Sequence, residues 1–314
     1  ERKMSINILH DNDADLGALN NRVIAVIGFG AQGRAQALCL RDSGANVIVG
    51  VRPGKSFDAA RQEGFRVMSV TEAAKAADHI HILLPDEMHG PVYNNEIKPS
   101  MTPGKTLSFS HGFSIVFGEI VPPAGCDVLM VAPKGPGTEV RKRFVEGFGV
   151  PGLIAVECNA SGKAKAVALA MAKAEGLTRA GVLECTMRQE TYEDLFGEQN
   201  VLCGGMVDLM KYGFETLIEA GYPPEVAYFE CVHEVKLIMD LIYEGGIQKM
   251  NAVISNTAEW GEYVNGPRII TPDVKARMDE AVRTSPLSGR ILRLGPLEDL
   301  APAYAALDLF AGSN

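Results

Sequence analysis

The 314-residue sequence lacks long hydrophobic runs, a basic excess and low-complexity tracts. Charged residues, Gly or Pro interrupt each apolar run well before the roughly 18 residues that a membrane-spanning helix needs, so we expect none. Thirty Lys and Arg stand against 39 Asp and Glu, giving a net charge of −9. This balance argues against a nucleic-acid-binding protein, because that class usually carries a basic face. A hydrophobic fraction of 46% excludes a disordered or fibrous chain.

Paired cysteines are also missing. The six cysteines are scattered and form no C-x-x-C motif, and no apolar stretch follows the first residues of the sequence. We therefore expect reduced, mostly buried thiols and no secretory signal, as in a cytoplasmic protein. The cysteines are Cys39, Cys126, Cys158, Cys185, Cys203 and Cys231.

The first part of the chain alternates short β-rich runs with helical segments. Runs such as VIAVIG and HIHILLP are apolar almost throughout, as strands buried on both faces require. This alternation predicts an α/β fold over residues 1–185, a Rossmann-type doubly wound parallel sheet with helices such as 31–41 and 162–174 on its faces. The expected strands are 23–27, 47–51, 66–68, 79–84, 106–110, 128–131, 153–157 and 180–184.

The pattern changes after residue 186. Apolar residues now recur with a helical period, as in LFGEQNVLCGGMVDLMKYGFETLIEAGY and PPEVAYFECVHEVKLIMDLIY. Pro224 stands where the first turn of a helix would begin, and Gly245-Gly246 where a helix would end. We predict an all-helical second domain over residues 186–314, whose segment 290–314 is an extra helix, a packing tail or a divergent end.

A glycine-rich loop directly follows the first predicted strand and opens a helix. In this context G-x-G-x-x-G indicates a dinucleotide site, because the glycines permit a tight turn, close approach of a pyrophosphate and close helix–strand packing. The helix N-terminus then favours the phosphate charge. A glycine-rich turn without a ligand is the alternative. The predicted cofactor-binding residues here are Gly28, Phe29, Gly30, Ala31, Gln32 and Gly33.

The end of the second strand usually separates NAD from NADP, because an acidic residue there binds the ribose 2′-hydroxyl. This chain instead has Arg52, Lys55 and Ser56, whose guanidinium, ammonium and hydroxyl groups suit a 2′-phosphate. Asp58 lies nearby and would weaken such a site. We therefore expect NADP, with a solvated basic turn as the alternative.

Two acidic pairs mark the helical half. Asp194 and Glu198 are four residues apart, as are Glu230 and Glu234, so each pair shares one helix face. Leu237 continues the second stripe. Carboxylates along an apolar seam repel each other strongly when desolvated and therefore favour a bound cation. Oxygen ligands without a His–Cys cluster indicate a hard metal, best Mg²⁺, and a pair of ions is a known arrangement. Two solvated acidic helix faces remain the alternative.

Several motifs now identify a resemblance that spans residues 11–275. The stretches GFGAQGRAQALCLRDSG, ILLPDEMHGPVY, SHGF, VAPKGPG, DLFGEQNVLCGG, YFECVHE and ISNTAEWGEYVNGPRII are similar to those of ketol-acid reductoisomerases (acetohydroxyacid isomeroreductases) of the short-chain class. The resemblance implies two Mg²⁺ ions, NADPH and a substrate that is 2-acetolactate or 2-aceto-2-hydroxybutyrate. It implies alkyl migration followed by reduction to dihydroxy acids, on the route to valine, leucine and isoleucine.

The resemblance also assigns roles to single residues. It implies that Asp194 bridges both ions, that Glu198, Glu230 and Glu234 complete the metal site, and that Ser255 contacts substrate oxygens. His111 and Lys134 are implied at the catalytic centre, and we expect Glu234 to take part in proton transfer there. Asp86, Glu87, Met88 and His89 would lie along the cofactor, and Gly135 near its nicotinamide end.

In short-chain members Glu230, Glu234 and Ser255 come from the partner subunit, which implies a homodimer with a shared site, a knotted-type helical domain and possible assembly into a dodecamer. No nucleic-acid or membrane partner is expected. Two positions depart from the family: Ser114 and Val116 replace the usual Asn and His after HGF. The competing hypotheses are an NADP-dependent β-hydroxyacid dehydrogenase without metal, and a catalytically inactive dinucleotide sensor.

Overall fold

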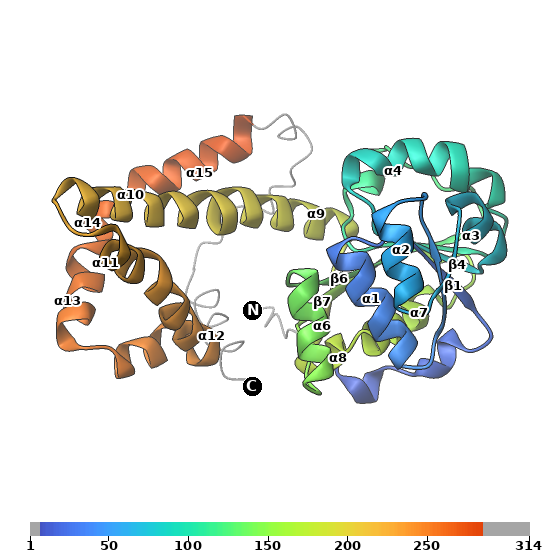
Figure 1. Cartoon of the computed structure of the whole chain (residues 1–314). Helices are drawn as coiled ribbons and strands as arrows, with labels where there is room; N and C mark the ends of the chain where they lie inside the picture. The colour runs from blue at the N-terminus through green and yellow to red at the C-terminus, as the bar shows by residue number, and fades with distance from the viewer. Residues whose placement is uncertain (1–6, 285–314) are drawn as a thin grey trace, which may run out of the picture. The chain divides into compact units, whose positions relative to one another are not determined.

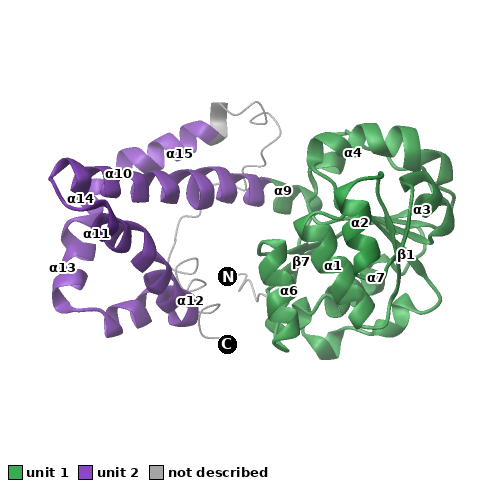
Figure 2. Cartoon of the chain, in the orientation of Figure 1, with its two compact units in different colours: residues 1–191 green, residues 192–314 purple. Residues whose placement is uncertain are grey.

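The computed structural model describes residues 7–284, and the chain divides into two compact units, Glu1–Thr191 and Tyr192–Asn314 (Figure 1, Figure 2). The first unit contains the sheet and the second unit is helical. The C-terminal segment 290–314, for which the sequence predicts an extra helix or a tail, lies outside the described residues. No helix within residues 7–284 is both long and apolar enough to cross a membrane.

An eight-stranded sheet forms the centre of unit 1, with the order β3-β2-β1-β4-β5-β6-β7-β8. Each predicted strand is present, with its ends displaced by at most two residues. Strand β4 is buried along its whole length, as its apolar run predicts. The strands are β1 Val23–Ile27, β2 Asn46–Gly50, β3 Arg66–Met68, β4 His79–Ile82, β5 Thr106–Phe109, β6 Asp127–Pro133, β7 Gly152–Cys158 and β8 Val182–Glu184.

The expected parallel sheet carries one antiparallel pair, β6 with β7. The chain leaves β6, forms a helix and returns to the same edge of the sheet, where Pro133 pairs with Gly152 and the Lys134 N–H donates to Pro151 O at 2.8 Å. Strands β3-β2-β1-β4-β5-β6 keep the Rossmann order and are parallel. The strand order therefore reverses between β1 and β4, the position where dinucleotides bind in such sheets.

Helices cover both faces of this sheet (Figure 1). Apolar residues of α1, α2, α6 and α7 belong to one buried cluster, whereas residues of α3 and α4 belong to a second cluster with β4 and β5. The α-helices are α1 Ala31–Asp42, α2 Lys55–Gln62, α3 Val70–Ala76, α4 Asp86–Val92, α5 Phe113–Val116, α6 Gly137–Val145, α7 Ala164–Ala174, α8 Leu177–Ala180 and α9 Met187–Phe196. Short 3₁₀ segments lie at Asp11–Asp13, Leu16–Leu19 and Lys98–Ser100, and a π-helical segment at Tyr93–Ile97.

Unit 2 is helical, as predicted. Pro224 is the first residue of its helix, and the chain has non-helical backbone angles at Gly245 and Gly246. The predicted helix end at these glycines is therefore a kink inside α12. The segments are η5 Gly197–Gly205, α10 Met206–Glu219, α11 Pro224–Tyr228, η6 Phe229–His233, α12 Glu234–Val253, α13 Asn256–Val264, α14 Gly266–Ile269 and α15 Pro272–Thr284, of which η5 and η6 are π-helical.

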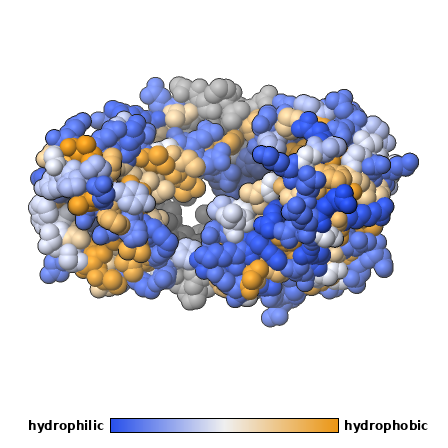
Figure 3. Space-filling view, in the orientation of Figure 1, coloured by the Kyte–Doolittle hydropathy of each residue, from blue (hydrophilic) through white to orange (hydrophobic). Residues whose placement is uncertain are grey.

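Apolar side chains remain exposed on unit 2 to an unusual extent. Among residues 7–284, all exposed large hydrophobic residues except Val121 and Val145 belong to this unit. Tyr212, Trp260 and Tyr263 are each more than half exposed. Figure 3 shows apolar residues gathered over these helices. Neither buried hydrophobic cluster includes a described residue of unit 2, so the described part of this unit leaves much of its apolar surface uncovered.

Candidate active site

The glycine loop has the geometry of a phosphate-binding turn. Gly28 has a φ of +104°, and a Cβ there would lie 2.5 Å from Leu83 O. A Cβ on Gly33 would lie 2.3 Å from Gly28 O, so α1 packs directly on the loop. A Cβ on Gly30 would meet no atom within 4 Å, and Gly30 caps the N-terminus of α1. The loop is thus closed on the protein side and open where a pyrophosphate would approach the helix N-terminus.

The three residues predicted to bind the 2′-phosphate lie beyond β2. Arg52 follows the buried Val51, and Lys55 and Ser56 form the first turn of α2. All three side chains are exposed. This helix N-terminus can hold a phosphate through backbone N–H groups and the charges of Arg52 and Lys55, although Asp58 lies in the same first turn and opposes them.

The residues predicted to follow the cofactor after β4 lie in the first turns of α4. Asp86 and Glu87 begin this helix. His89 is buried: its Nε2 lies 2.8 Å from Leu84 O, and its Nδ1 lies 2.8 Å from Ser114 Oγ. Since the carbonyl oxygen only accepts, Nε2 donates to it and Nδ1 accepts from the Ser114 hydroxyl. Ser114 is therefore a bonding partner of His89, and the loop after HGF keeps a polar contact.

A buried carboxylate joins two of the predicted catalytic residues. Glu190 lies in the first turn of α9 and is 1% exposed. Its Oε2 accepts from His111 Nδ1 at 3.0 Å and from the Gly112 N–H at 3.1 Å, and its Oε1 accepts from Lys134 Nζ at 2.9 Å. Burial raises the pKa of Glu190, but the hydrogen bonds and charges of His111 and Lys134 outweigh it, so the pKa lies below its ordinary value.

The sequence folds locally to bring these groups together. His111 follows β5 and Lys134 follows β6, so both lie at the carboxyl edge of the parallel sheet. Helix α9 packs on the Gly112 backbone: a Cβ there would lie 2.4 Å from Thr191 Oγ1 and 2.7 Å from Met187 O. Glycine at this position of the HGF motif therefore lets α9 place its carboxylate between the two strand ends.

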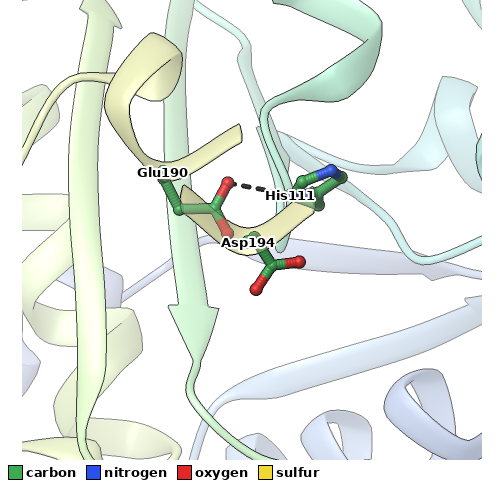
Figure 4. Close-up of side chains that lie close together, drawn as sticks. All are labelled: His111, Glu190 and Asp194. Atoms are coloured by element: carbon green, nitrogen blue, oxygen red, sulfur yellow. Dashed lines mark hydrogen bonds and ion pairs between the residues drawn. The ribbon is translucent and has the colours of Figure 1, made fainter. Parts of the chain in front are cut away.

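Asp194 lies one turn after Glu190 on the same helix. Ligand atoms of His111, Glu190 and Asp194 all lie within 4.8 Å of one another (Figure 4). Glu190 is a member of this cluster that the sequence did not lead us to predict. The signal was present, because Glu190 precedes Asp194 by four residues and extends the stripe that Asp194 and Glu198 begin.

The other predicted metal and substrate residues are exposed on unit 2. Glu198 and Glu230 each occupy the second position of a π-helical segment, η5 and η6, and Glu234 begins α12. Ser255 caps α13, its Oγ accepting from the Ala258 N–H at 3.2 Å. Within residues 7–284, His111, Glu190 and Asp194 form the one group of at least three close metal-binding side chains. The four predicted carboxylates therefore do not form such a close group within the described residues.

The fold and the site together define a class of protein. A glycine loop stands at the switch point of a Rossmann sheet, and an acid–base cluster lies at the same carboxyl edge, built from His111, Lys134 and Glu190. This combination is that of a dinucleotide-dependent oxidoreductase.

Comparison with known proteins identifies the family. Residues 18–181 match the family model of the acetohydroxy acid isomeroreductase NADPH-binding domain, and residues 187–284 match that of the ketol-acid reductoisomerase C-terminal domain. The chain belongs to the ketol-acid reductoisomerase family, as its motifs predict, and is an NADP-linked oxidoreductase. A metal-independent β-hydroxyacid dehydrogenase is not favoured.

Individual relatives agree with this assignment. The chain is 76% identical over 278 residues to the NADP(+) ketol-acid reductoisomerase of Akkermansia muciniphila, covering 88% of this chain and 85% of the relative. It is 58% identical over 284 residues to an NAD(+) ketol-acid reductoisomerase of the uncultured archaeon GZfos26G2, covering 88% and 86%. A solved NADH-preferring ketol-acid reductoisomerase from an uncultured archaeon has a TM-score of 0.86 at 58% identity, covering 88% of this chain and 86% of that one.

Proposed function

We propose that this chain converts 2-acetolactate and 2-aceto-2-hydroxybutyrate into dihydroxy acids for branched-chain amino acid synthesis, by alkyl migration followed by reduction with NADPH. The observation that carries the proposal is the cluster around Glu190, at the carboxyl edge of a dinucleotide-binding sheet. It places an imidazole, an ammonium group and the Asp194 carboxylate together, as acid–base chemistry on an anionic keto acid requires.

Glu190 has a positioning role in this proposal. Its carboxylate accepts from His111 Nδ1, which keeps a proton on that nitrogen and leaves Nε2 as the ring nitrogen that can exchange one. It also neutralises part of the charge of Lys134, whose Nζ donates to Glu190 Oε1 at 2.9 Å and is held in place by this hydrogen bond. We assign Lys134 to binding substrate oxygens and His111 to proton handling or water orientation beside them. Glu234 is our candidate for the proton acceptor in the migration step.

The donor set suits Mg²⁺. Asp194, Glu198, Glu230 and Glu234 would hold the two ions, and all four side chains are hard oxygen donors. Asp194 is the second carboxylate of the cluster that contains His111 and Glu190. Glu198 and Glu230 both lie in π-helical turns, which occur frequently at functional sites. When bound, the ions would polarise the substrate hydroxyl and ketone oxygens, and NADPH would supply the hydride.

We propose that a second copy of the chain completes this site, with Glu230, Glu234 and Ser255 contributed by the partner. The exposed apolar surface of unit 2 supports this, because the unit buries no hydrophobic cluster within the described chain. We take residues 1–185 as the cofactor domain and 186–314 as the dimerising metal and substrate domain. The knotted topology, a dodecamer and a cytoplasmic location stay predictions.

The turn Arg52 to Ser56 favours NADPH over NADH, because the exposed side chains of Arg52, Lys55 and Ser56 can bind the 2′-phosphate of NADPH by charge and hydrogen bonds.

The most direct test of the function is to measure product formation from 2-acetolactate with NADPH or NADH, with and without Mg²⁺. We expect a dihydroxy acid, faster with NADPH, and no turnover after chelation. Oxidation of NADPH that persists under strong chelation would instead indicate a metal-independent dehydrogenase.

A further inference from the structure

A chain of buried polar side chains runs from the centre of the sheet to the cofactor loops. His79 and His81 lie on β4, Ser108 lies beside them on β5, and Gln36 lies on α1; all four are fully buried. Ser108 Oγ lies 2.6 Å from His79 Nε2 and 2.7 Å from His81 Nδ1. Apolar side chains would fill these positions without the cost of desolvating four polar groups, so packing alone does not explain this hydrogen-bond network.

The network continues from Gln36 into the glycine loop. His81 Nε2 lies 2.8 Å from Gln36 Oε1, and Gln36 Nε2 donates to Gln32 Oε1 at 3.0 Å. Gln32 Nε2 in turn donates to Gly135 O at 2.9 Å. Gln32 belongs to the glycine loop, and Gly135 follows Lys134 in the loop after β6. The amide of Gln32 therefore ties these two loops together.

The last acceptor fixes the direction of every hydrogen bond in this chain. A carbonyl oxygen only accepts, so Gln32 must present its NH₂ to Gly135 and its oxygen to Gln36. Gln36 must then donate to Gln32 and accept from His81, which requires the proton of His81 on Nε2. The unprotonated Nδ1 of His81 accepts from Ser108, which accepts from His79.

The remaining atoms agree with this assignment. His79 Nδ1 is then an unprotonated acceptor at the far end of the chain, and it has no hydrogen-bond partner among the described residues. Burial lowers the pKa of His81 to about 4, so the ring carries one proton at neutral pH and keeps a defined tautomer. If one amide of this network were flipped, or His81 carried its proton on Nδ1, two donors or two acceptors would face each other.

The two loops that this chain joins also touch through their backbones. A Cβ on Gly137, the first residue of α6, would lie 2.3 Å from Ala31 O and 2.7 Å from the Gln32 N atom. Helices α1 and α6 therefore begin side by side, and the Gln32–Gly135 bond sets the spacing of two loops that both belong to the proposed cofactor site. Ser110, which precedes His111, contacts both ends of the Gln36 amide: its Oγ accepts from Gln36 Nε2 at 2.9 Å and lies 3.1 Å from Gln36 Oε1, to which its hydroxyl can donate.

We infer that His81 is a positioning residue for NADPH binding: it orients the Gln36 amide, which orients Gln32 and so joins the glycine loop to Gly135. The inference rests on the proposed function, since it takes these loops as the dinucleotide site. His81 acts on the affinity for NADPH through Gln36 and Gln32, without touching the cofactor.

Two substitutions of His81 separate this role from a packing role. In His81→Gln, the side-chain amide can place an N–H near the position of Nε2 and still donate to Gln36. In His81→Asn, the shorter amide reaches only the position of Nδ1, so Gln36 Oε1 loses the buried donor of β4 and keeps only the Ser110 hydroxyl. His79→Phe is the control, because His79 lies at the far end of the chain, and its loss leaves the Ser108 hydroxyl able to donate to His81.

The experiment measures the dissociation constant of NADPH for the full-length protein by fluorescence titration, together with the melting temperature without cofactor. We expect His81→Asn to weaken NADPH binding about tenfold, the loss of one buried hydrogen bond. We expect His81→Gln and His79→Phe to bind within about twofold of wild type, even where their melting temperatures fall. In turnover, His81→Asn should raise the KM for NADPH and leave kcat nearly unchanged.

Wild-type affinity in His81→Asn, or equal weakening in His81→Gln and His81→Asn, would overturn the inference. If His81→Asn does not fold, Gln36→Met tests the same link, because it removes the donor to Gln32. An unchanged affinity of Gln36→Met for NADPH would also overturn the inference. A wild-type protein that binds no dinucleotide would refute the proposed function itself, whereas failure of the His81 series alone leaves that function intact.

Discussion

Replacement of Glu190 by Gln tests whether its charge organises the catalytic cluster. The wild-type carboxylate accepts three hydrogen bonds, two on Oε2 and one on Oε1, and two of the donors are His111 and Lys134. An amide keeps the shape but has one acceptor oxygen. If that oxygen stays with His111 and Gly112, the NH₂ group faces the Lys134 ammonium and their ion pair is lost.

The expected loss follows from the burial of Glu190, which is 1% exposed. A hydrogen bond to a charged group is worth about 1.5–3 kcal/mol, so kcat/KM for 2-acetolactate should fall by about 10- to 150-fold in Glu190→Gln. The affinity for NADPH should not change, because the three donors to Glu190, His111, Gly112 and Lys134, are not among the predicted cofactor residues. Glu157→Gln, the same substitution at an exposed position of β7, should have no effect. A loss below threefold in Glu190→Gln would refute the role, since it would put the lost interaction under about 0.7 kcal/mol.

The contribution of the Glu190 charge to the stability of the fold should also depend on pH. The folded-state pKa of Glu190 is lowered, so its charge stabilises the fold above the unfolded-state pKa of about 4.3, and this contribution is lost as pH falls through the folded-state value. The melting temperature of wild type should therefore exceed that of Glu190→Gln at pH 7, and the difference should shrink below about pH 4. A difference that stays constant to pH 3 would contradict this assignment.

Two further predictions concern burial and assembly. Glu175 is 1% exposed, its carboxylate oxygens have no hydrogen-bond partner within residues 7–284, and burial raises its pKa well above the ordinary value. Its ionisation cost grows as pH rises above about 4.3, so Glu175→Met should raise the melting temperature, more at pH 8 than at pH 5; an equal gain at both would count against this. The variants Asp194→Asn and Glu230→Gln should each be inactive, and mixing them so that subunits exchange should recover about a quarter of wild-type activity. About half of the mixed dimers are heterodimers, and each heterodimer contains one intact shared site of two. No recovery would contradict a shared site.

Local signals in the sequence predict much of the fold. The strand β1 and the loop from Gly28 to Gly33 are recognisable because an apolar run, a tight turn and a helix start lie within a few residues. Pro224 starts its helix for the same local reason. The direction of β7 was not predictable from alternation, because it depends on where the chain returns after α6 has packed along α1.

In the site, too, local features were predictable from the sequence and features that depend on distant residues were not. The pair Asp194 and Glu198 is visible from spacing alone, whereas the importance of Glu190 comes from partners 79 and 56 residues away, His111 and Lys134. The π-helical turns at η5 and η6 could not be read from the apolar period, which fits an α-helix there equally well. In our proposal a second copy of the chain covers the exposed carboxylates of unit 2, and the sequence of one chain does not display such a surface.

The central claim is that carboxylates of the helical unit hold divalent ions. It is tested most directly by titrating the assembled, full-length protein with Mn²⁺, a spectroscopic substitute for Mg²⁺, and counting bound ions by electron paramagnetic resonance. We predict about two ions per chain in wild type, and loss of both in Asp194→Asn, since that carboxylate would bridge them. Ion binding that is unchanged in Asp194→Asn, or absent from the wild-type assembly, would contradict the account.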